Sequence, residues 1–225
     1  MRVFPLVFLV VAACASYGPI VDLPLAWRGV ESSPAPSPPV AQAFAASTLA
    51  FGLRDVRPDP YAVGGYEDSN AVIRTSDNIA SYCSTQLGQL LVHAGARFAG
   101  SPSAVLEAEL LEFRVIEGNT FNGVVRIRVI IQSGQSGQSG QAGAGKAWNK
   151  TYTGTSKRWG RTHNPENFNE ALSNSLVEVA QQLLQDPEFA AALQPASADP
   201  AAPLPPASDP YPLPGAGLGP GSSGA

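Results

Sequence analysis

Charge is scarce in this sequence. Only 14% of its 225 residues are charged, whereas an average globular domain carries about 25%, and the formal net charge is −4. Proteins that bind nucleic acid carry a strongly basic face, so this weak acidity argues against a nucleic-acid partner. The apolar content of 44% in turn excludes a chain that is disordered throughout.

Cysteine and histidine, which supply many metal ligands and nucleophiles, are almost absent. The sequence has two of each, namely Cys14, Cys83, His93 and His163. Two cysteines cannot complete a structural zinc site, and neither histidine has a carboxylate, a cysteine or the other histidine at metal-ligand spacing. We therefore predict no catalytic residues, no metal and no cofactor, and a buried, inert thiol at Cys83.

Long apolar runs are also missing, since none reaches the roughly 18–20 residues of a membrane-spanning helix. The first residues instead show one positive charge, an apolar stretch from Val3 to Val11 and then small residues, which is typical of an export signal. The run Val11-Ala12-Ala13-Cys14 resembles the lipobox of bacterial lipoproteins, in which the cysteine is acylated. An ordinary cleaved signal peptide is the alternative.

The lipobox resemblance implies a signal peptide over 1–13 and anchoring in a lipid bilayer through acylated Cys14. In that family, a residue other than aspartate after the cysteine favours the outer membrane, and Ala15 stands there. The predicted location is therefore the bacterial cell envelope, at the outer membrane, with the domain in the periplasm.

Proline is unevenly distributed, with seven residues in 1–47, five in 48–193 and nine in 194–225. We predict a lipidated cysteine and proline-rich tether over 14–47, one folded domain over 48–193 and a disordered proline- and glycine-rich tail over 194–225. Within the domain, repeated Ser-Gly-Gln predicts a solvated low-complexity loop at 133–145.

The first half of the domain reads as strand, loop and helix. Alternation predicts a strand over 48–54, and a glycine-bearing loop follows at 61–68. A short extra strand is expected near 71–74. Apolar residues at three- and four-residue spacing then predict an amphipathic helix that begins at Ser76 or Asp77 and closes at Gly95.

A hairpin follows, with strands over 104–116 and 121–131. Placing the turn at Gly118 and Asn119 puts the apolar side chains on one face and Glu109 opposite Arg128 on the other. The expected pairs are Leu106 with Ile131, Ala108 with Val129, Leu110 with Ile127 and Ile116 with Phe121.

A third strand over 147–155 and a helix from Pro165 complete the pattern. The order is strand, helix, three strands, helix. Two apolar helical stripes need a sheet face to cover them. The predicted fold is therefore α+β, with a mostly antiparallel four-stranded sheet and both helices on one face.

Basic residues and one tryptophan between the third hairpin strand and the last helix are candidate binding residues, because arginine and tryptophan are enriched at binding hot spots. A basic surface turn in which the tryptophan caps the core is the alternative. Two arginines after the first strand are further candidates. The full set is Arg54, Arg57, Lys157, Arg158, Trp159 and Arg161.

Three segments together resemble the YajG-type bacterial lipoproteins: residues 51–58 with the motif Arg-Asp-x-Arg-Pro, residues 93–98, and residues 150–152. The resemblance covers about 48–193. It implies an α+β domain at the outer membrane and carries over no catalytic residue.

We predict a membrane-anchored, non-enzymatic envelope lipoprotein that binds or scaffolds a protein partner or an envelope polymer. The alternative is an accessory ligand-binding lipoprotein of a transport or lipid-trafficking system. A fitted apolar pocket favours the alternative, whereas an exposed sheet face or edge favours the scaffold. Self-association into a homo-oligomer is a further candidate interaction.

Overall fold

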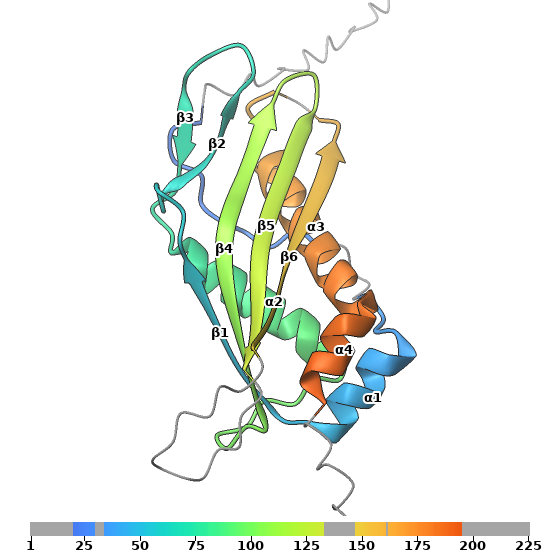
Figure 1. Ribbon diagram of the computed structural model, residues 1–225. Helices are drawn as coiled ribbons and strands as arrows, with labels where there is room; N and C mark the ends of the chain where they lie inside the picture. The colour runs from blue at the N-terminus through green and yellow to red at the C-terminus, as the bar shows by residue number, and fades with distance from the viewer. Residues whose placement is uncertain (1–19, 30–33, 133–146, 161, 195–225) are drawn as a thin grey trace, which may run out of the picture. The chain divides into compact units, whose positions relative to one another are not determined.

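The computed structural model describes residues 20–29, 34–132, 147–160 and 162–194 (Figure 1). The predicted signal peptide, Cys14, Arg161, the loop at 133–145 and the tail beyond residue 194 lie outside these residues.

The fold is α+β and is built on one mixed sheet of six strands. The strands are β1 (Leu49–Asp55), β2 (Ala62–Tyr66), β3 (Val72–Arg74), β4 (Ala104–Glu117), β5 (Phe121–Gln132) and β6 (Ala147–Arg158). Their order is β3-β2-β4-β5-β6, with β1 also beside β4. Strand β5 follows β4 along one side, and β1 and β2 share the other side.

This sheet corrects the predicted number of four strands and fits the predicted antiparallel arrangement only in part, because two of its five strand pairings are parallel. Strands β1 and β2 both run parallel to β4, because the chain crosses over through a helix before it enters β4. The segment predicted as a glycine-bearing loop contains β2, and the extra strand expected near 71–74 is β3. Together β2 and β3 form an antiparallel pair.

The structure has helices α1 (Pro38–Ala46), α2 (Ile79–His93), α3 (Pro165–Gln185) and α4 (Pro187–Leu193) in its described part. Helix α2 is capped by Asn78, whose side chain accepts from the Ser81 N–H, and not by Ser76 or Asp77 as predicted; Asn164 caps α3 in the same way. Gly95 takes a left-handed φ of 98° after α2, as predicted for a helix-ending glycine. Among the described helices, none is long and apolar enough to cross a membrane.

Helices α2 and α3 lie on the same face of the sheet, as predicted (Figure 1). Alternate residues of the long strands point into this layer, and Val125, Ile127 and Val129 of β5 are fully buried. Helix α3 approaches the sheet closely over a glycine of β6: a Cβ atom on Gly154 would lie 1.9 Å from the Ser175 carbonyl oxygen.

The ordered domain begins well before the predicted boundary at residue 48. Leu23 is fully buried, and its backbone N–H donates to the Arg74 carbonyl at 2.8 Å. In α1, Phe44 is buried and meets Phe189 of α4 edge-on at 6.0 Å. Apolar residues between the prolines thus join the core, so residues 20–29 and 34–47 are not a tether without core contacts.

The β4–β5 register matches the prediction from Val105 to Leu110 of β4 and departs from it between Glu112 and Glu117. Leu106 pairs with Ile131 and Glu109 with Arg128, as expected. The register then shifts between Leu110 and Glu112, so that Phe121 faces Glu117 instead of Ile116. A β-bulge supplies the extra residue. It turns Phe113, Val115 and Glu117 toward the helical layer.

Candidate binding site at the free edge of strand β1

Strand β1 is bonded to the sheet along one side only. Its partner is β4, in parallel register from Leu49 opposite Ala104 to Asp55 opposite Leu110. The Thr48 carbonyl accepts from the Ala104 N–H, and the Val56 N–H donates to the Leu110 carbonyl. Even-numbered residues therefore direct their backbone groups toward β4, and odd-numbered residues direct theirs outward.

Among the described residues, the first outward residue of β1 is the only one of its outward residues with a backbone partner. The Leu49 N–H donates to the Arg97 carbonyl at 2.8 Å, and the Leu49 carbonyl accepts from the Ala99 N–H at 3.1 Å. Within the described residues, no hydrogen bond reaches the backbone N–H or C=O of Phe51 or Leu53. Unpaired groups in such a row are a template for another extended chain.

An apolar groove lies beside this open stretch, between β1 and α2. It has a volume of about 850 Å³. The rings of Phe51 and Phe98 stack in its wall with centroids 6.1 Å apart, and Val92 is half exposed. On the α2 side, Gly88 has no side chain to fill the groove; a Cβ atom there would lie 3.6 Å from the Phe51 ring. Other lining residues are Leu49, Ala50, Ser84, Thr85, Gln89, His93, Ala99 and Gly100.

On the opposite, open face of the sheet, β1 carries the predicted binding residue Arg54. Its guanidinium pairs with Glu109 of β4, which also accepts from Arg128 of β5. These hydrogen bonds, from Arg54 and then Arg128, hold the pKa of Glu109 below its usual range. Two arginines therefore share one carboxylate, so the rung of the sheet formed by Arg54, Glu109 and Arg128 carries one surplus positive charge.

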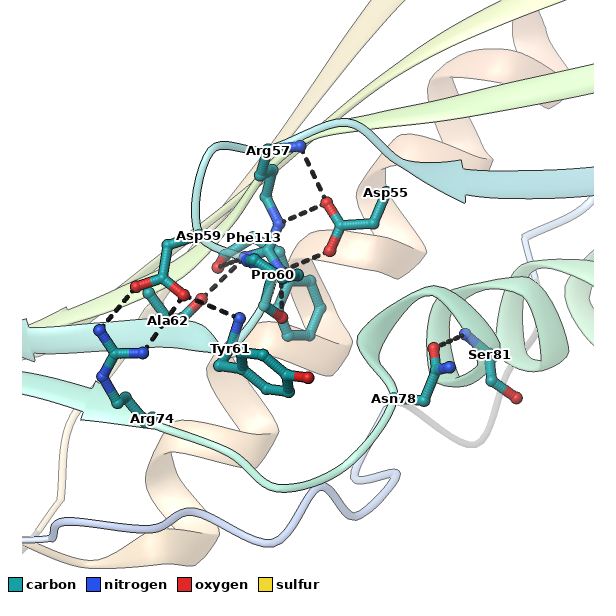
Figure 2. A network of polar contacts seen from close by, with 10 residues as sticks. All are labelled: Asp55, Arg57, Asp59, Pro60, Tyr61, Ala62, Arg74, Asn78, Ser81 and Phe113. Atoms are coloured by element: carbon teal, nitrogen blue, oxygen red, sulfur yellow. Dashed lines mark hydrogen bonds and ion pairs between the residues drawn. The ribbon is translucent and has the colours of Figure 1, made fainter.

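Arg57, also predicted as a binding residue, fixes the loop after β1 (Figure 2). Its side chain is 7% exposed and pairs with Asp55 at 2.7 Å. The other guanidinium N–H groups donate to the carbonyls of Pro60, Ala62 and Phe113. All five side-chain donors of this arginine are therefore occupied. This geometry makes Arg57 a brace between β1, β2 and β4.

A second pair holds the same loop from outside (Figure 2). Arg74 of β3 pairs with Asp59 at 2.8 Å, and the Tyr61 N–H donates to the same carboxylate. The Tyr61 bond, helped by Arg74, holds the pKa of Asp59 below its usual value. Tyr61 itself remains largely exposed.

Side chains and a neighbouring segment occupy the β3 edge and part of the β6 edge. At β3, the Arg74 N–H donates to Val21 and its carbonyl accepts from Leu23. At β6, Glu178 of α3 accepts from the Thr155 N–H at 2.5 Å, and Gln182 donates to the Thr153 carbonyl at 2.9 Å. Among the described residues, Asn149 and Thr151 of β6 have no backbone partner on this edge either, so it is the apolar groove beside β1 that suits the β1 edge to pair with a further strand.

The predicted basic turn lies at the end of β6, far along the sheet from the groove. Lys157 lies over the indole of Trp159, with 5.8 Å from Nζ to the ring centroid. Trp159 is 67% exposed, so it does not cap the core. Arg158 pairs with Glu170 of α3 at 2.8 Å. The structure thus brings Lys157 and Trp159 together and separates them from Arg54 and Arg57.

Burial and hydrogen bonds also shift the pKa values of groups away from the β1 edge. Burial raises the pKa of the Cys83 thiol, which is fully buried as predicted. Burial opposes ionisation of Asp186, but bonds from Tyr152 and Lys150 keep the pKa of this carboxyl below its usual value. Among the described residues, no group of three or more histidine, cysteine or acidic side chains could hold a metal ion.

The sequence did not predict the groove residues Val92 and Phe98. Both are apolar and exposed, and Phe98 follows the helix-ending Gly95 that the periodicity identified. The sequence does not reveal that these two side chains are exposed, because apolar residues near a helix end are more often buried.

No family model matches this sequence, and no curated protein sequence matches it. Among solved structures, a Xanthomonas campestris protein described under the family model DUF330 aligns with 71% of this chain and 92% of its own, at a TM-score of 0.50 and 9% identity. A PelC dodecamer from Paraburkholderia phytofirmans aligns over 69% of this chain and 96% of its own, at a TM-score of 0.36 and 16% identity. The likeness to the Xanthomonas protein is one of fold alone, and the resemblance to YajG-type lipoproteins stays a prediction.

Proposed function

We propose that this protein is a lipid-anchored, non-enzymatic binding protein of the bacterial envelope, and that it takes an extended segment of a partner protein onto β1. The observation that carries the proposal is the pair of open backbone positions, Phe51 and Leu53, beside the apolar groove. The lipobox-like run ending at Cys14 supports the anchor and the envelope location.

Strand addition explains why an edge and a groove occur together. The added backbone would bond to the N–H and C=O groups of Phe51 and Leu53, which gives affinity. Alternate side chains of the same segment would point into the groove between β1 and α2, which gives specificity. A partner segment with apolar residues at every second position therefore suits this site.

The charge on the open face of the sheet indicates which residues the partner segment should carry there. The remaining side chains of an added strand would lie beside Arg54, whose carboxylate partner Glu109 is shared with Arg128. An acidic residue at that position would neutralise the surplus positive charge of the rung. The segment we propose is thus extended, apolar on one face and acidic on the other.

The groove also supports a second candidate function, as an accessory ligand-binding lipoprotein. Its volume of about 850 Å³ falls within the range of small-molecule sites, about 300–1,000 Å³. An apolar ligand such as an acyl chain would fit the lining of Phe51, Val92 and Phe98. Such a ligand would leave the backbone groups of β1 unpaired, which gives the two functions different requirements.

The test starts with a photo-crosslinking amino acid at Gln89, an exposed residue of α2 that lines the groove, in whole cells. The crosslinked partner segment is identified by mass spectrometry and synthesised as a peptide. Its affinity is then measured for the wild type, for Leu53→Pro, which removes an outward N–H of β1, and for Leu53→Ala, which removes only the side chain. Thr151→Pro is the matched control, because Thr151 has the same outward orientation on β6.

We expect Leu53→Pro to lose at least tenfold in peptide affinity, more than Leu53→Ala, while Thr151→Pro binds like the wild type. Circular dichroism and thermal melting establish that each variant is folded. A peptide N-methylated at alternate residues should also fail to bind to the unaltered protein. Equal binding of Leu53→Pro and Thr151→Pro would overturn the proposal, and a co-purified lipid in the groove with that result would favour the ligand-binding function.

A further inference from the structure

The distance between the lipid anchor and the folded domain is short. Ile20 is the first described residue, and it lies six positions after Cys14, with five residues between them. Six residues span at most about 21 Å even when fully extended. The place where Ile20 sits on the domain therefore determines which part of the surface lies near the bilayer.

Ile20 is attached at the end of the sheet where β2, β4 and β6 finish. Its backbone N–H donates to the Tyr66 hydroxyl at 2.7 Å. Tyr66 is the last residue of β2, and its ring meets the His163 imidazole edge-on at 5.0 Å. The N–H of His163 in turn donates to Glu117, the last residue of β4, at 2.9 Å.

One row across the sheet joins this attachment point to Trp159. Tyr66 pairs with Glu117, Glu117 with Phe121, and Phe121 with Arg158, the residue before Trp159. Three strand spacings amount to about 14 Å. Both Ile20 and Trp159 thus belong to the same end of the sheet, where the arrowheads of β4 and β6 lie (Figure 1).

The chemistry of this end suits a membrane surface. The Trp159 indole is 67% exposed, and Lys157 lies against its ring. Tryptophan favours the headgroup level of a bilayer because its ring is apolar and its N–H is polar. The exposed acids Glu67 and Asp68 at the β2–β3 turn offset the charge of Lys157. Arg158 is paired with Glu170, so the attraction comes from the indole more than from net charge.

We infer that the Trp159 end of the sheet lies against the bilayer that holds Cys14, with the indole among the lipid headgroups. This inference rests on the acylation of Cys14 that the proposed function includes. It does not depend on partner binding at β1. It assigns Trp159 and Lys157 to the lipid surface and leaves the groove and the open sheet face for other molecules.

The test uses the full mature protein with its anchor, reconstituted into vesicles of phosphatidylethanolamine and phosphatidylglycerol that contain lipids brominated near the headgroup. Quenching of tryptophan fluorescence is compared for the wild type, Trp159→Phe and Trp148→Phe. Trp148 is the matched control, because it lies eleven residues earlier on the same chain, about 36 Å away at strand spacing.

We expect Trp159→Phe to lose at least half of the quenching, and Trp148→Phe and Leu53→Pro to keep that of the wild type. The quenching should change little with salt. Equal quenching of the wild type and Trp159→Phe would overturn the inference while leaving the anchor intact. Mass spectrometry of the N-terminal peptide reads the anchor separately: a Cys14 without acyl chains overturns both the anchor and this inference.

Discussion

Strands β1 and β6 both lie at an edge of the sheet, but their outward backbone groups differ in their hydrogen-bond partners. Along β6, side chains of α3 reach the edge, with Glu178 on the Thr155 N–H and Gln182 on the Thr153 carbonyl. Along β1, the backbone groups of Phe51 and Leu53 have no such partner in the part of the chain that the structure describes, and the neighbouring helix α2 leaves an apolar groove.

The difference originates in how closely each helix approaches its strand. Helix α3 lies directly over Gly154 of β6, so its polar side chains extend past the strand to the edge. Helix α2, in contrast, meets β1 across the Phe51 ring, which would lie 3.6 Å from a Cβ atom on Gly88. An edge covered by its own helix resists further pairing, whereas an uncovered apolar edge invites it.

The largest effect is expected where β1 is fixed to the rest of the sheet. Arg57→Leu should lower the free energy of unfolding by about 3–5 kcal/mol, because it leaves the buried Asp55 carboxylate without its partner. Arg54→Leu is the control, since Arg54 is exposed and Glu109 keeps Arg128; its cost should be about 0.5 kcal/mol. Urea unfolding compares the two, and equal losses would contradict the bracing role of Arg57.

The next effect compares one glycine from each edge. Gly154→Ala on β6 should cost about 3 kcal/mol, because the new methyl group would meet the α3 backbone at 1.9 Å. Gly52→Ala on β1 meets no atom within 4 Å and should change stability by less than about 0.5 kcal/mol. Thermal melting of both variants tests this, and a tolerated Gly154→Ala would mean that α3 can move away from β6.

A smaller effect concerns the rung that joins β1 to β5. Glu109→Gln should lower stability at pH 7 by about 1 kcal/mol, because it weakens the bonds to Arg54 and Arg128. The folded pKa of Glu109 is lowered, so the wild type has this stabilisation above the unfolded value of about 4.3 and loses it as the pH falls through the folded value. Unfolding curves of the two proteins should therefore converge in acid; a constant difference would assign the loss to another cause.

The smallest effect on stability should accompany a large effect on binding. Val92→Asp places a charge in the groove at a half-exposed position, so it should cost less than about 0.5 kcal/mol of folding stability. Affinity for the partner peptide should nevertheless fall at least tenfold, because the apolar lining is interrupted. Thr153→Asp, on the covered edge, should leave this affinity unchanged in the same titration.

Much of the fold follows from periodicity. The helix capped by Asn78, the helix starting at Pro165 and the pairing of Leu106 with Ile131 are all legible in the spacing of apolar residues. Strand β2 is not, because five residues with two glycines carry too little pattern. The parallel pairing of β1 depends on long-range placement of α2, which local propensity does not encode.

The candidate site was predictable only in part. Arg54 and Arg57 stand three residues apart and have the same charge, yet one is exposed on the open face and the other is enclosed by carbonyl groups. Composition cannot separate them, because burial depends on the loop that folds back over Arg57. The same holds for Leu23 and Phe44, which lie among prolines but pack into the core.

The bulge in β4 divides that strand into two segments with opposite phase. Below it, even-numbered residues such as Leu106 are internal, and above it odd-numbered residues such as Phe113 are internal. A strand that kept a single phase past Leu110 would place Ile116 inside and Glu117 outside. The extra residue at Leu111 reverses this, so Glu117 stays within the fold, where its carboxylate receives the His163 N–H. Deleting Leu111 would therefore remove the bulge and leave the inside and outside residues of both segments unchanged.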